Sequence, residues 1–200
     1  MTVAPVSSAK QVIVEGADDK RFIDQLLMAR GAAGVQVQPI GGKSQLRAYL
    51  QILRNDDEFP VVSSVAVLRD ADDNPRAAWN SVVGALSAAG FAAPGAPGDF
   101  ADGPPRVGAL LLPGGGKHGS LETLCLASLL SAELECIDRL LDCVSGLGAP
   151  RPNQLDKARA YAWLATRERP GLRVGEAAEK GYWNFSSHAF DDLWAFLSRI

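Results

Sequence analysis

Four short apolar runs in the first half of the chain predict buried β-strands. Each run is rich in Val, Ile or Leu and is closed by turn or charged residues, a pattern typical of strands covered on both faces. The runs span Gln11 to Val14, Val35 to Ile40, Ser64 to Arg69 and Val107 to Leu112. The sequence therefore predicts a sheet built from these four segments.

Helical spacing separates the four runs. Apolar residues recur three and four positions apart from Phe22 to Leu27, from Leu46 to Leu53 and from Trp79 to Leu86, which marks one buried face of each helix. The predicted order is β-α-β-α-β-α-β. Such alternation implies right-handed crossovers and a mainly parallel sheet flanked by helices, with ligands at the carboxyl ends of the strands. We therefore expect an α/β fold with four strands.

The second half of the chain reads differently. Residues 91–105 are rich in Gly, Pro and Ala and predict a long mobile loop before the fourth strand. Helical patterns follow from Ser120 onward, from Asn153 to about Arg167, and from Ser187 to Arg199. We expect an α/β domain over residues 1–150 and a helical extension over 151–200, packed on it in one compact unit.

Composition and charge restrict the classes of partner. The 200 residues are 47% hydrophobic and 22% charged, as in soluble globular chains. The net charge of −3 lacks the basic balance of a protein that holds nucleic acid by charge alone. We therefore expect DNA or RNA to be bound locally, through a loop or a metal ion. No apolar stretch approaches a membrane span and no leader pattern opens the chain, so we expect a cytoplasmic protein with no membrane partner.

The three cysteines suggest no chemistry of their own. Cys125, Cys136 and Cys143 are odd in number and form no CxxC pair, which excludes a disulfide framework and a zinc site of that type. Cys136 and Cys143 lie seven positions apart in a helical pattern. We expect both of them to be buried, as free cysteines usually are.

Acidic residues follow the first and third predicted strands. Glu15 stands at the end of the first, with Asp18 and Asp19 after it, and Asp70 and Asp72 stand at the end of the third. Carboxylates crowded at one sheet edge repel unless a cation neutralises them, and hard oxygen ligands favour Mg²⁺ or Mn²⁺. The alternative is an ordinary helix start at the first strand and an ordinary turn before the proline that follows the third.

These motifs, in this order, resemble a Toprim domain, the fold of topoisomerases, bacterial primases and OLD-family nucleases. The resemblance covers about residues 10–125 and includes Val14-Glu15-Gly16 and Asp70-Ala71-Asp72. Ser120 and Glu122 resemble the SxE element of OLD-family nucleases, and Lys157 resembles the lysine that those nucleases place beside their metals. The resemblance implies a Toprim-like, Rossmann-like sheet that holds magnesium.

The resemblance also implies roles for these residues. Two metal ions about 3.5–4 Å apart can activate a water and stabilise the leaving oxygen of a phosphodiester. We expect Glu15, Asp19 and Asp70 at one metal, and Asp72 and Glu122 with Ser120 at the second. The expected catalytic residues are Glu15, Asp70, Asp72, Glu122 and Lys157.

Lys157 has two interpretations. Its ammonium could stabilise the negative charge that the phosphate carries in the transition state, or it could be an ordinary solvated helix lysine. The first interpretation places Lys157 at the border of a buried stripe, from which its stem could extend toward the metals. The residues expected in this stripe are Ala158, Tyr161, Ala162 and Ala165.

Two glycine-rich loops could bind phosphate. Gly41, Gly42 and Lys43 follow the second strand and open a helix, so backbone N–H groups, the helix dipole and the ammonium point toward a possible anion. Lys117 and His118 lie in the loop after the fourth strand. Neither loop is a Walker A motif, because no glycine stands five positions before the Gly-Lys pair. Simple tight turns are the alternative for both.

The expected function is metal-dependent, nuclease-type phosphoryl transfer on DNA or RNA by a two-metal carboxylate site. The alternative is a Toprim-type module that binds nucleic acid or a protein partner without turnover. The two differ in whether any metal supports formation of a cleaved product.

Overall fold

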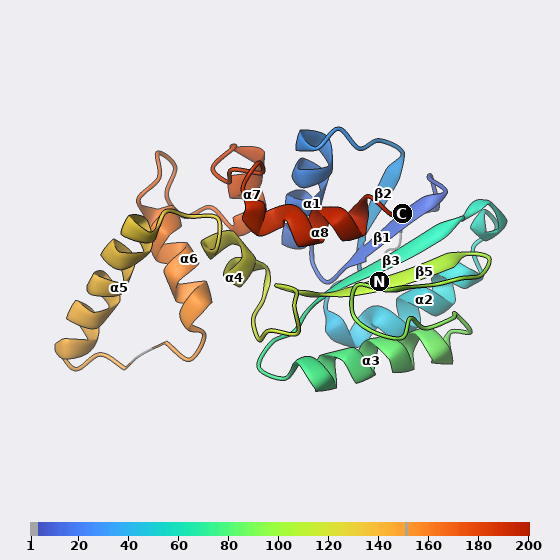
Figure 1. Ribbon diagram of the computed structural model, residues 1–200, viewed down its shortest axis with the longest axis horizontal. Coiled ribbons are helices and arrows are strands. Elements are labelled where there is room, and N and C mark those ends of the chain that lie inside the picture. Colours follow the sequence, from blue (N-terminus) through green and yellow to red (C-terminus); the bar gives the residue numbers. More distant parts are fainter. Residues whose placement is uncertain (1–3, 151) are drawn as a thin grey trace.

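The computed structural model describes residues 4–150 and 152–200 and shows an α/β fold around one twisted sheet (Figure 1). The sheet has five strands in the order β2-β1-β3-β5-β4. Four of them are parallel: β1 (Lys10–Val14), β2 (Val35–Pro39), β3 (Ser64–Asp70) and β5 (Arg106–Leu112). These match the four predicted runs closely, and the predicted alternation with helices is confirmed.

The fifth strand corrects the predicted count of four. β4 (Phe100–Ala101) pairs antiparallel with β5, inside the segment expected to be a loop. A strand of two residues has no periodicity to detect. Its position depends on Phe100, whose ring covers Gly108 so closely that a Cβ there would lie 2.5 Å from the ring. Phe100 also stacks on Phe196 with ring centroids 4.9 Å apart.

Helices cover both faces of the sheet (Figure 1). α1 (Ala17–Ala29), α7 (Val174–Glu179) and α8 (Asp191–Leu197) lie on one side, and α2 (Leu46–Arg54) and α3 (Pro75–Ala88) on the other. Successive strand residues enter opposite cores, as with Val12 and Ile13 of β1. Burial on both faces is why each strand reads as a continuous apolar run. The described residues also form the short 3₁₀ helices η1 (Lys43–Gln45), η2 (Phe59–Val61) and η3 (His188–Phe190).

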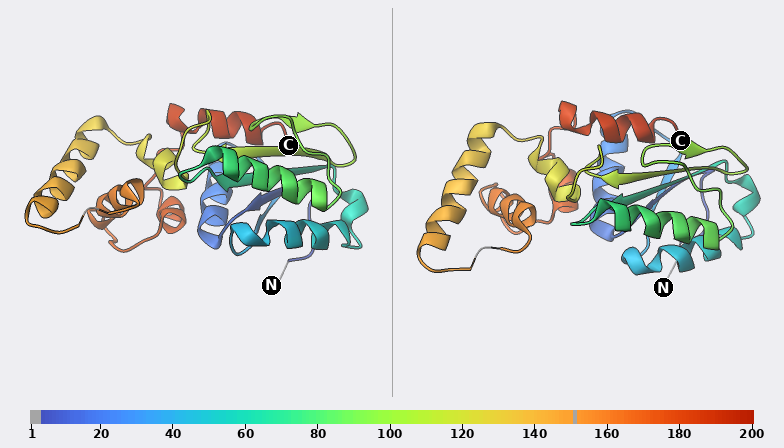
Figure 2. Two further views of the ribbon diagram at one scale, coloured as in Figure 1. Left: turned by 90° about the horizontal axis from the view of Figure 1, so that it is seen from below. Right: turned by 60° about the horizontal axis from the view of Figure 1, so that its bottom comes forward.

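A helical lobe projects from one end of the sheet (Figures 1 and 2). α4 (Leu121–Leu126) leads into it, and α5 (Ser131–Gly146) and α6 (Leu155–Ala165) form it. Cys125 in α4 is buried, but Cys136 and Cys143 of α5 are exposed, so the prediction for those two was wrong. α5 lies at the outer end of the lobe and buries Ile137. Residues on its outer side therefore face solvent although they share its periodicity.

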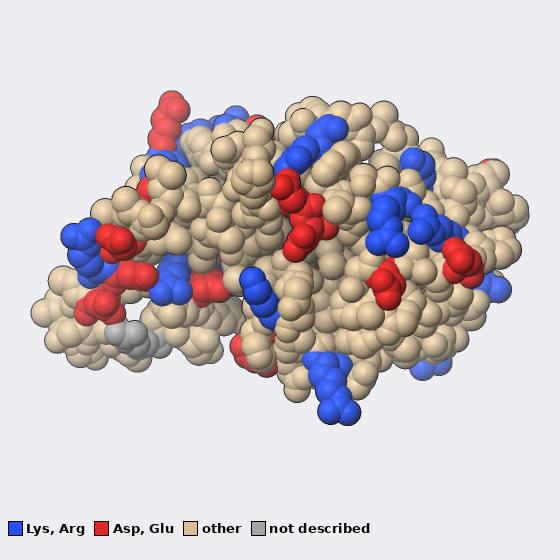
Figure 3. All heavy atoms as spheres, in the orientation of Figure 1, with Lys and Arg blue, Asp and Glu red and all other residues tan. Residues whose placement is uncertain are grey.

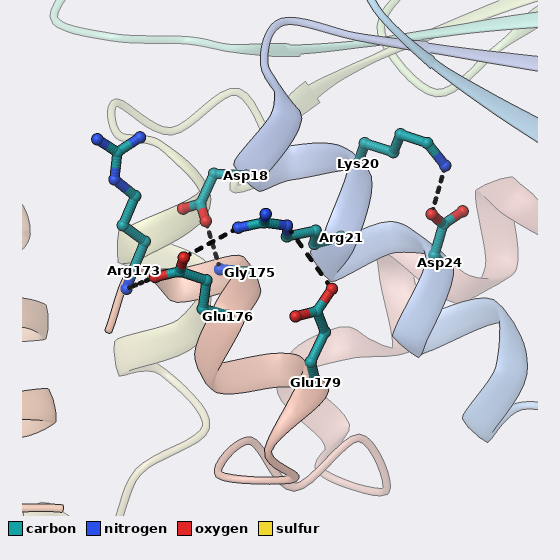
Figure 4. A network of polar contacts seen from close by, with 8 residues as sticks. All are labelled: Asp18, Lys20, Arg21, Asp24, Arg173, Gly175, Glu176 and Glu179. Carbon is teal, nitrogen blue, oxygen red and sulfur yellow. Dashed lines mark hydrogen bonds and ion pairs between the residues drawn. The ribbon is translucent and has the colours of Figure 1, made fainter. Parts of the chain in front are cut away.

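The short helix α7 packs closely against α1 (Figure 4). The Gly175 N–H donates to Asp18 Oδ1 at 2.9 Å, and Arg21 Nη1 lies 3.1 Å from Glu176 Oε1. A Cβ at Gly175 would lie 2.2 Å from the carbonyl oxygen of Asp18. The absence of a side chain at Gly175 therefore allows this approach. The sequence did not predict α7, because six residues are too few to establish a helical period.

The surface carries charge of both signs. On the face in Figure 3, Lys and Arg side chains lie among Asp and Glu side chains, and most of the surface is uncharged. Across residues 4–150 and 152–200, no helix combines the length and apolar character that crossing a membrane requires.

Candidate functional site

Glu15 and Asp70 lie at the same edge of the sheet. Glu15 directly follows β1 and Asp70 ends β3, and these neighbouring strands run parallel. Arg69 precedes Asp70, and its side chain is only 9% exposed. The Arg69 Nε lies 3.6 Å from Glu15 Oε1, an ion pair longer than a hydrogen bond. The carboxyl edge therefore combines two acids with one buried cation.

Asp19 joins them from the first turn of α1. Its Oδ2 accepts the Gly16 N–H at 2.7 Å, which fixes the turn between β1 and α1. Burial raises the pKa of Asp19 to about 6, and the nearby charges of Glu15, Asp18 and Glu122 act in the same direction. The Asp19 carboxyl is thus a helix-start residue and also a member of the acidic group.

Burial raises the pKa of Asp70 well above its usual range, and the charges of Asp19, Glu15 and Glu122 raise it further. The Leu121 N–H, donated to Asp70 Oδ1 at 3.0 Å, opposes this rise. Burial likewise raises the pKa of Glu15, and the Arg69 charge opposes it. Glu15, Asp19, Asp70 and Glu122 therefore share one electrostatic neighbourhood, drawn from β1, α1, β3 and α4.

A small cavity lies at the centre of this group. Its volume is about 10 Å³, and its polar lining comes from Glu15, Asp19, Arg69 and Asp70. Such a volume holds about one water-sized sphere. Glu15 Oε1 and Arg69 Nε are buried, and neither has a hydrogen-bond partner among the described residues. These two atoms form the 3.6 Å ion pair with each other, so a charged pair with unused hydrogen-bonding capacity belongs to the residues that line the cavity.

Asp72 lies on the more exposed side of the site. Its backbone has a positive φ of 51°, and its N–H and C=O groups both bond to Gly119. Lys43 Nζ donates to Asp72 Oδ2 at 2.8 Å. The preceding Gly41 and Gly42 have φ of 79° and 117°, and the Gly42 N–H donates to the Glu15 carbonyl. That N–H is therefore engaged within the chain, and Lys43 is the loop group turned toward the acids.

Glu122 connects the sheet edge to the helical lobe. The Ser120 Oγ donates to Glu122 Oε2 at 2.8 Å, and Lys157 Nζ lies 3.8 Å from Glu122 Oε1. Lys157 therefore reaches the acidic group from α6.

The prediction of a buried stripe beside Lys157 was wrong. α6 buries Ala160, Trp163 and Leu164, and it leaves Tyr161 37% exposed. Trp163 stacks on Trp183 with ring centroids 4.6 Å apart. Burial of this large ring sets the rotation of the helix, which spacing among alanines could not indicate.

The loop after β5 is held against the loop after β3. The ring Nδ1 of His118 lies 2.8 Å from the carbonyl oxygen of Asp73. A carbonyl only accepts, so this Nδ1 carries the proton. Lys117 is exposed on the same loop. His118 therefore stabilises the loop pair beside Asp72.

A wider cleft of about 350 Å³ opens in front of the acids. Its lining includes Asp70, Asp72, His118 and Glu122, together with residues 153–157 at the start of α6. Within the described parts of the chain, no three His, Cys, Asp or Glu side chains are arranged closely enough to hold a metal ion as they stand. The carboxylates instead bond to backbone N–H groups and to Lys, Arg and Ser side chains.

Sequence reasoning missed two contributors to the site. Arg69 ends a predicted strand, and a cation in an otherwise apolar run is the signal that indicates a buried partner. Asp156 accepts a hydrogen bond from Thr123 Oγ1 at 2.8 Å and joins α6 to α4. No local pattern indicates that contact, because 33 positions separate the two residues.

The family model described as "Protein of unknown function (DUF3226)" matches residues 9–200. No curated protein matches the sequence. Structures of the C-terminal region of the OLD protein from Xanthomonas campestris pv. campestris, phased with iodine, mercury and platinum, align with 96% of this chain. The alignments cover 91%, 86% and 89% of those three chains, in that order. Their TM-scores are 0.45, 0.41 and 0.43, and the sequence identities are 17%, 12% and 16%.

Proposed function

The chain belongs to the DUF3226 family, and for it we propose metal-dependent hydrolysis of nucleic-acid phosphodiester bonds at a Toprim-type acidic site. The observation that carries the proposal is the convergence of Glu15, Asp19 and Glu122 on the buried Asp70, whose pKa the charges of all three raise. Carboxylates with perturbed pKa values at a cleft mark candidate functional sites. The resemblance of the acidic motifs to Toprim domains supports the same assignment.

The donor set fits magnesium or manganese. Both ions prefer oxygen ligands. Glu15 lines the small cavity, and its buried Oε1 has no hydrogen-bond partner among the described residues. Glu15, Asp19 and Asp70 would hold one ion, and Asp72 and Glu122, with Ser120 beside them, would hold a second. Bound cations would neutralise the carboxylates, activate the attacking water and stabilise the leaving oxygen.

The chain's own cations complete the proposed site. Lys157 is half exposed beside Glu122, from where its ammonium can meet negative charge on a phosphate. Lys43 is similarly placed beside Asp72. Arg69, buried against Glu15, holds that carboxylate in position. The Asp19 carboxyl, with a pKa of about 6, is mostly ionised at pH 7 and available as a ligand.

A second candidate is a binding module without turnover. Three of the acids already form ion pairs with cations of the protein: Glu15 with Arg69, Asp72 with Lys43, and Glu122 with Lys157. Such internal pairing neutralises carboxylates without a metal. It favours a module that recognises nucleic acid or a protein partner through this edge.

The test compares wild type with Asp70→Asn. Purified protein is incubated with plasmid, single-stranded DNA and RNA in Mg²⁺ or Mn²⁺, and Mn²⁺ affinity is measured by calorimetry. The asparagine side chain of this variant can still accept the Leu121 N–H but carries no charge. We expect cleavage by wild type only, weaker Mn²⁺ binding by the variant, and a higher melting temperature of the metal-free variant because repulsion is relieved.

Asp24→Asn is the matched control. Asp24 lies on α1 and pairs with Lys20, so its replacement removes a carboxylate outside the acidic group. It should leave cleavage and Mn²⁺ affinity unchanged. Nucleic-acid binding by wild type without any product would favour the binding module. Equal Mn²⁺ affinity of wild type and Asp70→Asn would make Asp70 a structural residue.

A further inference from the structure

The wider cleft in front of the acids has two chemically different walls. The inner wall carries carboxylates, among them Asp70 and Glu122. The outer wall is residues 153–157, at the start of α6, and includes the side chains of Asn153, Gln154 and Leu155. Asp156 and Lys157 of the same segment contact Thr123 and Glu122, so the two walls meet there. A ligand in this cleft would therefore contact the acidic site together with the amides and the apolar side chain.

The amides of the outer wall are available to a ligand. Asn153 and Gln154 are exposed, and no hydrogen bond engages either side-chain amide in the described parts of the chain. Each amide offers two donor hydrogens and an acceptor oxygen. Side-chain amides of this kind pair with the edges of nucleobases. Leu155 lies half-buried beside them and adds apolar contact.

The outer wall is held in place relative to the acids. Thr123 of α4 donates to Asp156 Oδ2 at 2.8 Å, and Lys157 reaches Glu122. Arg159 then joins Asp156 to Asp138 of α5, with Arg159 Nε 2.7 Å from Asp138 Oδ1. These contacts connect α4, α5 and α6, so the width of the cleft is set before any ligand enters.

The size of the cleft limits what can occupy it. Small-molecule sites start at about 300 Å³, and this cleft measures about 350 Å³. One nucleotide unit suits such a volume, whereas a base-paired duplex is far wider. A paired base also has its Watson–Crick edge occupied by its partner, so only an unpaired base can present that edge to the amides.

We propose that this cleft binds one unpaired nucleotide of a single strand, with its base against Asn153 and Gln154 and its phosphate toward Lys157 and the acidic rim. The inference rests on the proposed function, because a phosphate beside these carboxylates needs a divalent cation. It adds a substrate class, single-stranded DNA or RNA, and two residues that read the base.

The experiment measures binding separately from cleavage. Fluorescence anisotropy with labelled 12-residue homopolymers, deoxy and ribo, and with a duplex of the same length is recorded in Ca²⁺, and electrophoresis confirms intact strands. Wild type is compared with the double variant Asn153→Ala/Gln154→Ala. The control Gln51→Ala removes an exposed amide from α2.

We expect wild type to bind single strands at least tenfold more tightly than the duplex and to distinguish among the four bases. The double variant should bind single strands about tenfold more weakly, and its affinities for the four bases should differ less than those of wild type. The control should match wild type in both respects. Comparison of the deoxy and ribo series identifies which strand is the ligand. Circular dichroism verifies that the variants are folded.

Three results would overturn the inference: equal affinity of wild type for single strand and duplex, unchanged affinity of the double variant, or a uniform loss across the four bases, which indicates phosphate contact. Failure of the proposed nuclease is a separate outcome. If wild type prefers single strands but yields no product with Mg²⁺ or Mn²⁺, the inference about the cleft stands and the proposed catalysis does not.

Discussion

Arg69 Nε lies 3.6 Å from Glu15 Oε1 at the carboxyl edge of the sheet, with the two side chains 9% and 23% exposed. Arg69 Nη1 also donates to Ser81 Oγ at 2.9 Å, which ties the pair to α3. A buried charge costs several kcal/mol unless a partner offsets it. This pair is therefore how the fold accommodates a carboxylate beside Asp70.

Removing Arg69 should leave Glu15 as an uncompensated buried charge. We expect Arg69→Met to lower the free energy of unfolding by about 3–5 kcal/mol, measured by urea denaturation at pH 7.5 in EDTA. Arg69→Met combined with Glu15→Gln should recover much of that loss, because no unpaired charge remains.

Arg21→Met serves as the control for that pair, since Arg21 forms only half-exposed ion pairs with Glu176 and Glu179. Its cost should stay below about 1 kcal/mol. A double variant no more stable than Arg69→Met alone would assign the role of Arg69 to packing and to its bond with Ser81.

The raised pKa of Asp19 predicts that the free energy of unfolding depends on pH. Its pKa rises from an ordinary 3.8 to about 6 in the folded chain, so the folded state binds the proton more tightly than the unfolded state. The stabilising contribution is present below about pH 4 and is lost as the pH rises through about 6. Asp19→Asn should therefore be more stable than wild type at pH 7.5 in EDTA, by about 2 kcal/mol.

The two proteins should differ much less at pH 4, where the folded-state carboxyl of Asp19 is protonated and the unfolded-state carboxyl is partly protonated as well. Urea denaturation at both pH values provides the measurement. A stability difference that is the same at pH 4 and pH 7.5 would show that the Asn side chain acts through the Gly16 hydrogen bond and not through charge.

Lys157 tests the proposed chemistry from outside the sheet. The stability cost of Lys157→Met should be small, because the ammonium is half exposed and 3.8 Å from Glu122. Loss of an electrostatic donor should depress cleavage by about 10²–10³, with Mn²⁺ binding retained in calorimetry. Lys180→Met, at the exposed end of α7, is the control. Cleavage at the wild-type rate by Lys157→Met would identify it as a solvated surface lysine.

Gly175 tests the packing of α7 on α1. Gly175→Ala places a methyl group 2.2 Å from the Asp18 carbonyl oxygen, and backbone atoms on both helices must move. We expect destabilisation of about 1–3 kcal/mol, measured by thermal unfolding. Gly84→Ala is the matched control, since a Cβ there meets nothing within 4 Å inside α3. That variant should be stabilised by about 0.5–1 kcal/mol. Equal effects at both glycines would contradict close packing.

The sequence by itself determined the parallel core of the fold. Val12, Ile13 and Val14 alternate between two covered faces, so an apolar run marks the strand without any knowledge of its neighbours. Because the carboxyl ends of parallel strands share one edge, the positions of Glu15 and Asp70 after β1 and β3 also follow from the order of elements.

Only the tertiary structure decided which partners those acids meet. Arg69 against Glu15, Lys43 against Asp72 and Lys157 against Glu122 join residues from different elements. The burial of Trp163 in place of the expected stripe and the pairing of Phe100 across Gly108 depend on the shape of distant surfaces. Local periodicity reports which side of an element is apolar, whereas the contact that each side makes depends on the packing of the whole chain.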